Sequence, residues 1–288
     1  VSDFQLYGIF GHPLGHTLSP AMQEAAFKAK RLKAFYLAFD FDSKNFKKIL
    51  RNKSRLILDG FNITVPYKQD GLKFLDRVLP EARAIGAVNT VFKQGRKWVG
   101  ANTDVDGFIR SLKLEGKFKI RGSHCVVLGA GGAARAAVFG LASNGALEIV
   151  IANRSSRKAA QIARDFKKCF KKTKIRTVGI KRDELQCEIL KGQLVVNATS
   201  LGLKKRDRKL LSASMVPKAV GKNRKLFYDL IYSPAETDFM KCAKRKGHRT
   251  LNGVGMLVFQ GARAFQYWTG KKAPEAIMRT ALERALAA

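Results

Sequence analysis

The 288-residue chain is long enough for two domains, and its 46% hydrophobic and 27% charged residues are typical of a soluble globular protein. No apolar run approaches the roughly 20 residues of a membrane-spanning helix, which argues against a membrane protein. The N-terminal Val-Ser-Asp-Phe lacks the regions of a secretory signal, so we expect a cytoplasmic protein. The net charge is +33, which attracts anions.

The first third of the chain is predicted to alternate strands and helices. Ser19 and Pro20 fit the N-cap and first position of a helix. The patterns predict strands over residues 4–10, 34–41 and 57–65, helices over 21–31, 44–50, 72–78, 81–85 and 104–114, and a hairpin of 87–92 with 98–101.

The rest of the chain repeats strand and helix, and no internal repeat is visible. We expect strands over residues 125–128, 147–152, 175–178, 194–197, 226–230 and 249–251, and helices over 132–143, 157–168, 235–245, 255–268 and 274–286. This alternation predicts an α/β protein with parallel sheets and helices on both faces. We predict an N-terminal α/β domain over residues 1–105, with helices 255–288 packing back on it, and a Rossmann-type domain over 106–254.

A glycine cluster at residues 126–135, Val-Val-Leu-Gly-Ala-Gly-Gly-Ala-Ala-Arg, joins a β-branched run to an Ala-rich helical segment. Gly129 permits the tight turn, Gly131 lets backbone N–H groups approach a pyrophosphate, and Ala134 permits close packing of helix on strand. The segment therefore predicts a dinucleotide site at a helix N-terminus.

The ribose-reading position falls about 20 residues after these glycines, at Asn153 and Arg154. An acidic residue there would select NAD, whereas this chain has an arginine, followed closely by Ser155, Arg157 and Lys158. Because a guanidinium suits bidentate phosphate recognition, the cofactor is predicted to be NADP(H).

Four loops at the ends of predicted strands gather small hydroxyl and amide residues. They are residues 17–19, 62–68 (Asn-Ile-Thr-Val-Pro-Tyr-Lys), 87–90 and 100–104 (Gly-Ala-Asn-Thr-Asp). Strand ends are where open α/β sheets bind ligands, and Asn, Thr and Ser both donate and accept hydrogen bonds. The loops therefore predict a site for a small polyhydroxylated ligand around one lysine and one aspartate.

These loops, together with residues 129–134, 153–154, 197–200, 228–232 and 253–260, resemble the shikimate dehydrogenase family over essentially the full length and in the same order. The resemblance implies metal-free, reversible, NADPH-dependent reduction of 3-dehydroshikimate to shikimate in aromatic amino-acid biosynthesis, in a cleft between the two domains. It also implies that Lys68 and Asp104 are the catalytic pair. A cation and proton source beside the ketone oxygen suits hydride reduction.

The same resemblance implies the remaining site residues. The substrate carboxylate is expected to meet Thr17 and Ser19. The ring hydroxyls are expected to meet Asn62, Thr64, Asn89, Asp104, Tyr232 and Gln260. The cofactor is expected to contact Gly129, Ala130, Gly131, Gly132, Ala133, Asn153, Arg154, Ser155, Lys158 and Thr199, with Leu230, Gly253 and Met256 at the nicotinamide.

One position departs from the family pattern, which usually has two serines in the carboxylate-binding loop. Thr17 occupies the first of these places. The hydroxyl is retained, so carboxylate binding should persist, but the added methyl narrows the pocket. Quinate therefore stays open as an alternative substrate, although Arg154 argues against the NAD preference that is common among quinate dehydrogenases.

Other classes are less consistent with the sequence. A glutamyl-tRNA reductase would need a nucleophilic cysteine in the N-terminal half, and the first cysteine is Cys125. A non-enzymatic nucleic-acid binder would fit the charge, but the basic runs 167–174 and 204–209 lack interleaved aromatic residues. The four cysteines and four histidines show no metal-ligand spacing, so no metal is predicted. A monomer and a homodimer both remain possible, and the absence of an initial Met is consistent with a processed or excised chain.

Overall fold

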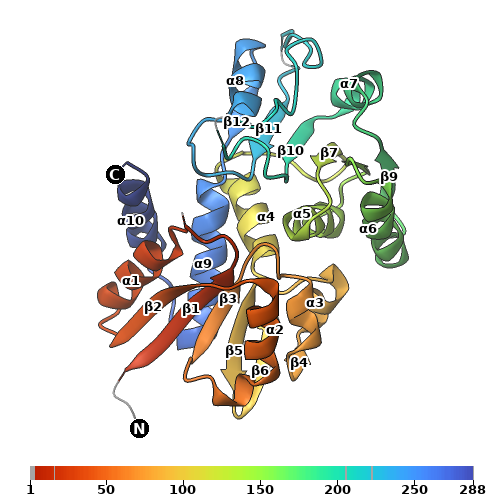
Figure 1. Cartoon of the computed structure of the whole chain (residues 1–288). Helices are drawn as coiled ribbons and strands as arrows, with labels where there is room; N and C mark the ends of the chain where they lie inside the picture. Colours follow the sequence, from red (N-terminus) through yellow and green to blue (C-terminus); the bar gives the residue numbers. More distant parts are fainter. Residues whose placement is uncertain (1–3, 16, 205, 222, 288) are drawn as a thin grey trace. The chain divides into compact units, whose positions relative to one another are not determined.

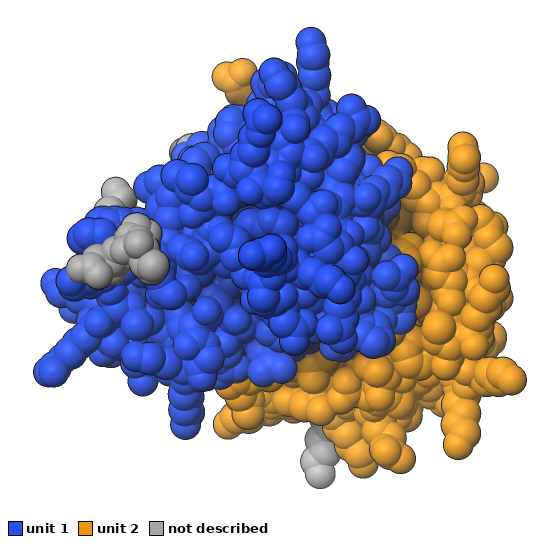
Figure 2. Space-filling view, turned by 90° about the horizontal axis from the view of Figure 1, so that it is seen from below, with its two compact units in different colours: residues 1–107, 258–288 blue, residues 108–257 orange. Residues whose placement is uncertain are grey.

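The computed structural model describes residues 4–15, 17–204, 206–221 and 223–287. His16, one of the four histidines, and Lys205, in the basic run 204–209, lie outside these ranges. The chain forms two compact units (Figure 2). Unit 1 comprises residues 1–107 and 258–288, and unit 2 comprises residues 108–257.

Unit 1 is built on a six-stranded sheet in the order β2-β1-β3-β5-β6-β4 (Figure 1). The strands are β1 (Gln5–Gly11), β2 (Ala34–Asp40), β3 (Gly60–Ile63), β4 (Arg77–Val78), β5 (Thr90–Gln94) and β6 (Lys97–Ala101). Strands β1, β2 and β3 are mutually parallel, whereas β5 pairs antiparallel with both β3 and β6. The sheet is therefore mixed rather than parallel throughout. Its antiparallel β5–β6 pair is the hairpin predicted from the sequence, whose connection is too short for a parallel crossover.

Helices cover both faces of this sheet. The helices of unit 1 are α1 (Ser19–Ala29), α2 (Ser43–Arg51), α3 (Pro80–Ile85) and α10 (Glu275–Ala287), whereas α4 (Asp104–Leu114) and α9 (Val254–Thr269) each belong partly to unit 1 and partly to unit 2. Tyr7 of β1 stacks on Phe27 of α1 and Trp268 of α9, while Phe10 of the same strand joins the core under α2. Because side chains alternate along a strand, these contacts place α1 and α9 on one face and α2 on the other.

Unit 2 contains a second six-stranded sheet, in the order β12-β11-β10-β7-β8-β9, whose strands are all parallel. The strands are β7 (His124–Leu128), β8 (Glu148–Ala152), β9 (Lys174–Val178), β10 (Leu194–Asn197), β11 (Leu226–Asp229) and β12 (Arg249–Leu251). The helices are α5 (Gly132–Ser143), α6 (Ser156–Cys169), α7 (Arg182–Lys191) and α8 (Asp238–Arg245). The strand–helix alternation is that of a Rossmann-type sheet.

Helices also sandwich the second sheet. Val126 and Leu128 of β7 pack in one core with Leu185 of α7 and Phe239 of α8. On the other helical layer, α5 and α6 meet through edge-on aromatic packing of Phe139 on Phe166. Because all strands of this sheet are parallel, their carboxyl ends and the N-termini of the helices that follow them lie at one edge. The Gly129 turn lies at this edge.

Two local predictions were wrong, and one helix was missed. Residues 72–78, expected to be helical, form a short 3₁₀ turn (Asp70–Lys73) and strand β4, because β4 is stabilised by pairing with the distant β6. Helix α7 was not predicted. Ser19 does not cap α1: Leu18 occupies the N-cap without a side-chain hydrogen bond. The Ser19 hydroxyl instead hydrogen-bonds the Tyr36 side chain.

No helix within the described residues is long and apolar enough to span a membrane. Among the same residues, no group of three or more His, Cys, Asp or Glu side chains is arranged to hold a metal ion. All four cysteines are free thiols, with Cys125 and Cys242 buried.

A buried histidine makes the stability of unit 2 depend on pH. His248 stacks on Phe227; its Nε2 faces the Pro217 carbonyl oxygen at 3.0 Å, and its Nδ1 accepts the Lys225 N–H at 3.3 Å. This pattern requires the neutral ring with the proton on Nε2. Burial, aided by the Lys225 charge, lowers the pKa of His248.

A lowered folded pKa means that the contribution is complete above the unfolded value, about 6.5, and is lost as pH falls toward the folded value. We therefore expect the free energy of unfolding in urea to decrease between about pH 7.5 and 5.5, and to decrease less in His248→Gln. Identical pH slopes in the two proteins would contradict this assignment.

Candidate active site

The predicted catalytic pair is formed within unit 1. Lys68 Nζ donates to Asp104 Oδ2 at 2.7 Å, and the two side chains are 14% and 5% exposed. Lys68 follows the carboxyl end of β3, and Asp104 is the first residue of α4. A carboxylate in the first turn is favoured by the helix dipole, so the fold itself stabilises the anionic partner.

An amide network fixes the orientation of Asp104. Asn89 Nδ2 donates to Asp104 Oδ1 at 2.9 Å and to Thr103 Oγ1 at 2.9 Å. Asn89 Oδ1 accepts the Thr103 N–H at 2.7 Å, and Gln260 Oε1 lies 3.3 Å from Asn89 Nδ2. The sequence predictions Lys68, Asn89, Asp104 and Gln260 therefore lie together, although they come from segments up to 192 positions apart.

A second buried network surrounds Asn62 on the α1 face of the sheet. Asn62 Nδ2 donates to the Asn89 carbonyl oxygen and to Thr90 Oγ1, and its Oδ1 accepts from the Tyr36 hydroxyl at 2.6 Å. Both amide hydrogens of Asn62 are thus used within the protein. Tyr36, in β2, was not selected from the sequence because it looks like one more apolar residue of a strand.

Tyr36 links two of the predicted substrate-binding residues. Its hydroxyl donates to Asn62 and also forms a side-chain hydrogen bond with Ser19. Burial raises the pKa of Tyr36 well above its usual value, and the Ser19 bond partly opposes that rise. The neutral phenol therefore donates to Asn62 at the end of β3 and accepts from Ser19 at the start of α1. Thr17 and Thr64 lie in the flanking loops and are partly buried.

The glycine turn of unit 2 has the features that a pyrophosphate needs. The φ of Gly129 is +116°, and a Cβ there would lie 2.8 Å from the Ala198 carbonyl oxygen, so only glycine fits. No atom lies within 4 Å of a Cβ placed on Gly131, the N-cap of α5. No side chain caps α5 and its first turn has no acid, so its N–H groups are available to an anion.

Next to this turn, the loop after β8 presents Arg154. Asn153 Nδ2 donates to the Ser155 carbonyl oxygen, and Ser155 Oγ accepts the Lys158 N–H as the N-cap of α6. The loop is therefore held without Arg154, which is exposed and whose guanidinium has no partner among the described residues. A cation in this position is free to bind a phosphate.

Two loops at the same edge are joined by buried polar groups that the sequence did not identify. Asp229 Oδ1 accepts from Asn197 Nδ2 and from the Ile231 N–H, while Asn197 Oδ1 accepts from the N–H and hydroxyl of Thr199. Burial raises the pKa of Asp229, and these hydrogen bonds oppose that rise. The network fixes Thr199 and the start of the loop containing Leu230.

The remaining predicted residues lie close to that loop. A Cβ on Gly253 would collide with the Leu230 carbonyl oxygen, so the two segments are in direct contact and leave room only for glycine. Met256 follows in α9 and is buried. Tyr232 is partly buried, which raises its pKa.

Three family models match successive parts of the chain. They are the shikimate dehydrogenase substrate binding domain over residues 9–91, shikimate / quinate 5-dehydrogenase over 113–231, and the shikimate 5'-dehydrogenase C-terminal domain over 253–283. The chain belongs to the shikimate dehydrogenase family. This membership confirms the resemblance identified from the loop motifs.

Members of the shikimate dehydrogenase family match over nearly the whole length. The shikimate dehydrogenase (NADP(+)) of Methanopyrus kandleri is 40% identical over 283 residues, which cover 98% of this chain and 96% of that protein. The Thermus thermophilus shikimate 5-dehydrogenase, solved in complex with NADP(H) and shikimate, is 35% identical with a TM-score of 0.85, over 98% and 100% of the two chains. A quinate dehydrogenase from Corynebacterium glutamicum, solved with NAD, is 29% identical with a TM-score of 0.86, over 98% and 100%.

Proposed function

We propose that this member of the shikimate dehydrogenase family catalyses the reversible, NADPH-dependent reduction of 3-dehydroshikimate to shikimate. The observation that carries the proposal is the largely buried Lys68–Asp104 ion pair, held by Asn89 among hydroxyl and amide side chains. The likeness to NADP-dependent relatives supports the same reaction. We assign substrate binding to residues 1–105 with 255–288, and cofactor binding to 106–254.

NADPH supplies the hydride when it is bound. The uncapped N-terminus of α5 would hold its pyrophosphate, beside residues 129–133, and Arg154 would hold the 2′-phosphate, with Asn153, Ser155 and Lys158 at the ribose. Thr199 would contact the cofactor, and Leu230, Gly253 and Met256 would flank the nicotinamide. This set contains no acidic side chain that would repel the 2′-phosphate.

Lys68 provides the acid chemistry. Its ammonium stabilises the negative charge that develops on the substrate carbonyl oxygen and then donates a proton to that oxygen. Asp104 holds the ammonium in place and accepts a hydrogen bond from the neighbouring substrate hydroxyl. Because Asn89 already occupies Asp104 Oδ1, the carboxylate cannot rotate away from Lys68 without losing that bond.

The other polar residues position the substrate. Thr17 and Ser19 would bind its carboxylate at the start of α1, and Thr64, Asn62, Asn89, Tyr232 and Gln260 would contact ring hydroxyls. Among the described residues, Asn62 Oδ1 accepts only the Tyr36 hydroxyl and so keeps one lone pair for a ring hydroxyl. Asn89 Oδ1 already faces the Thr103 N–H and the hydroxyls of Thr90 and Thr103.

Tyr36 should act as a positioning residue for this substrate. Tyr36→Phe removes the bond to Asn62 and the link to Ser19, so the KM for shikimate should rise about three- to tenfold with a smaller change in kcat. The KM for NADP⁺ should not change. Steady-state kinetics with each substrate varied separately would measure the effect.

Tyr7→Phe is a matched control, because the buried Tyr7 hydroxyl, on the adjacent strand β1, has no hydrogen-bond partner among the described residues. It should leave both KM values unchanged. Equal effects of the two substitutions would remove Tyr36 from the site.

Quinate is the alternative substrate, supported by the extra methyl of Thr17 and by the structural likeness to a quinate dehydrogenase. The test measures oxidation of shikimate and of quinate, each with NADP⁺ and with NAD⁺. We expect the highest kcat/KM for shikimate with NADP⁺. A higher value for quinate with NAD⁺ would favour the alternative.

A further inference from the structure

The positive charge of the chain is concentrated in unit 2. Residues 108–257 contain 33 of the 55 lysines and arginines but only 10 of the 22 acidic residues. The proposed dinucleotide site uses few of these cations, because it includes only Arg154 at the 2′-phosphate and Lys158 at the ribose. Most of the excess lysines and arginines of unit 2 therefore lie outside the proposed dinucleotide site.

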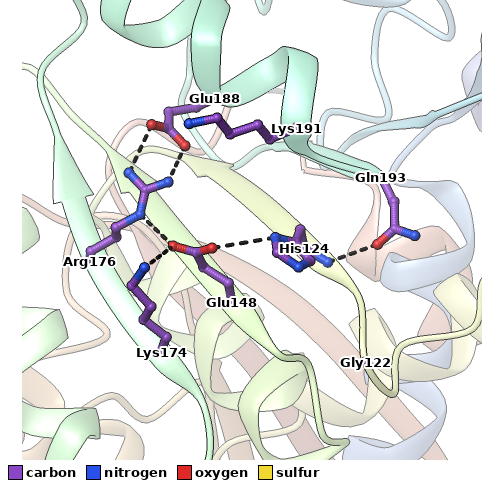
Figure 3. Close-up of a pocket in the computed structure, with 8 residues that line it drawn as sticks. All are labelled: Gly122, His124, Glu148, Lys174, Arg176, Glu188, Lys191 and Gln193. Atoms are coloured by element: carbon purple, nitrogen blue, oxygen red, sulfur yellow. Dashed lines mark hydrogen bonds and ion pairs between the residues drawn. The ribbon is translucent and has the colours of Figure 1, made fainter.

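A hollow lies at the amino edge of the unit 2 sheet, where β7, β8 and β9 begin (Figure 3). It has a volume of about 690 Å³ and is lined by residues that include His124, Glu148, Arg176 and Lys191. A second hollow of about 540 Å³ adds residues 171–173 and shares His124, Glu148 and Lys174 with the first. The two hollows are therefore one continuous concave surface.

The floor of this surface is a neutralised ion network. Arg176 donates from Nε to Glu148 at 2.5 Å and makes a two-pronged contact with Glu188, as Figure 3 shows. Glu148 also accepts from Lys174 and faces His124 Nδ1, both at 3.3 Å. Hydrogen bonding to Arg176, followed by that to Lys174, lowers the pKa of Glu148. Glu148 and Glu188 are thus both paired with Arg176, so neither is left to repel an anion.

The rim carries the excess charge. Lys171, Lys172 and Lys191 are exposed, and none of them has a hydrogen bond or ion pair with the described residues. They come from the segment before β9 and from the end of α7, on two sides of the neutral floor. Among the described residues, no Phe, Tyr or Trp side chain lines either hollow, so the surface lacks the large aromatic rings of a base-stacking platform.

We infer that this surface binds a short oligophosphate chain, recognised by its charge through Lys171, Lys172 and Lys191. An oligophosphate carries several closely spaced negative oxygens, so it can contact several of these lysine ammonium groups at once. A ligand with a single carboxylate cannot. The chain could be inorganic or the phosphate tail of a nucleotide, since both present the same oxygens.

The surface is separate from the predicted dinucleotide site. His124 begins β7 and Leu128 ends it immediately before the Gly129 turn. Four residue steps of a parallel strand span about 13 Å. An oligophosphate at the amino edge therefore does not occupy the position expected for the cofactor pyrophosphate.

The test is equilibrium binding of inorganic tripolyphosphate to the full chain, measured by calorimetry at low salt. The triple variant Lys171→Ala/Lys172→Ala/Lys191→Ala should bind about tenfold more weakly, from the loss of three exposed ion contacts. The control Lys44→Ala/Lys48→Ala/Arg51→Ala removes the same charge from exposed positions on α2 of unit 1 and should bind as the parent does. Saturating NADP⁺ should not displace the ligand.

Equal losses in both triple variants would reduce the effect to the overall charge and overturn the inference, as would displacement by NADP⁺. Comparable affinity for ATP and tripolyphosphate supports recognition of the chain alone, whereas tenfold tighter ATP binding identifies a nucleotide as its source. Tighter binding of a single-stranded DNA of about 20 nucleotides, lost in the same variant, would replace the assignment by a nucleic-acid surface. Every readout is binding, so the result is independent of dehydrogenase activity.

Discussion

Lys68→Ala is expected to lower kcat for 3-dehydroshikimate reduction by about 10²–10⁴-fold, with a smaller change in KM. The variant loses both the cation that stabilises the developing oxyanion and the proton that neutralises it. Because the interaction is strongest in the transition state, the loss should fall on kcat. Steady-state oxidation of NADPH measures it directly.

Two comparisons make the Lys68 result specific. Lys73→Ala removes an exposed lysine five positions later, paired with Asp70 only at 3.9 Å, and should retain parental turnover. Lys68→Arg keeps the charge, but a guanidinium does not release its proton, so turnover should remain well below that of the parent. Near-parental turnover in a folded Lys68→Ala protein would remove Lys68 from the mechanism.

Arg154→Ala is expected to lower kcat/KM for NADPH by about 10- to 100-fold and to change kcat/KM for NADH much less. The estimate corresponds to the loss of a charge-assisted hydrogen bond, about 1.5–3 kcal/mol. Since Asn153 and Ser155 hold the loop without Arg154, the backbone should not move in the variant. Initial rates with each cofactor measure the change in preference.

Arg164→Ala is the control, because Arg164 lies farther along α6 and donates to Gln161. It should leave both cofactors unaffected. A proportional loss with NADPH and NADH in Arg154→Ala would indicate a general structural role and contradict recognition of the 2′-phosphate.

Local sequence signals predicted the parts of the fold that depend on neighbouring residues. The helix expected over residues 132–143 has the observed bounds of α5, because the glycines before it and Asn144-Gly145 after it mark both ends. Strand β10 was also predicted with its observed bounds, since a continuous apolar run defines it.

Features that depend on distant pairing were not predicted. Strand β4 has only two residues, and its pairing with the distant β6 is what makes it a strand. Helix α7 buries few apolar side chains, Leu185 and Ile189 among them, and has no side-chain N-cap, so its sequence gives a weak helical signal. The role of Tyr36 depends on the order of the strands in the sheet. It requires knowing that β1 lies between β2 and β3, so that the phenol reaches Asn62 across that strand.

The candidate site shows the same division. The motif of residues 62–68 and Asp104 could be selected from the sequence, because lysine and aspartate stand out among small polar residues. The loops that contain Thr90 and Thr103 were also selected, but the sequence does not show that both hydroxyls bond to Asn89 and so help to hold Asp104. Asn197 and Asp229 likewise gain their meaning only when β10 and β11 are neighbours.

The most direct test of the proposed function is consumption of NADPH by the purified chain with 3-dehydroshikimate, followed by absorbance and repeated with NADH. We predict NADPH oxidation with stoichiometric formation of shikimate, and a much lower rate with NADH. The absence of oxidation with either cofactor would contradict the assignment of this chain as a shikimate dehydrogenase.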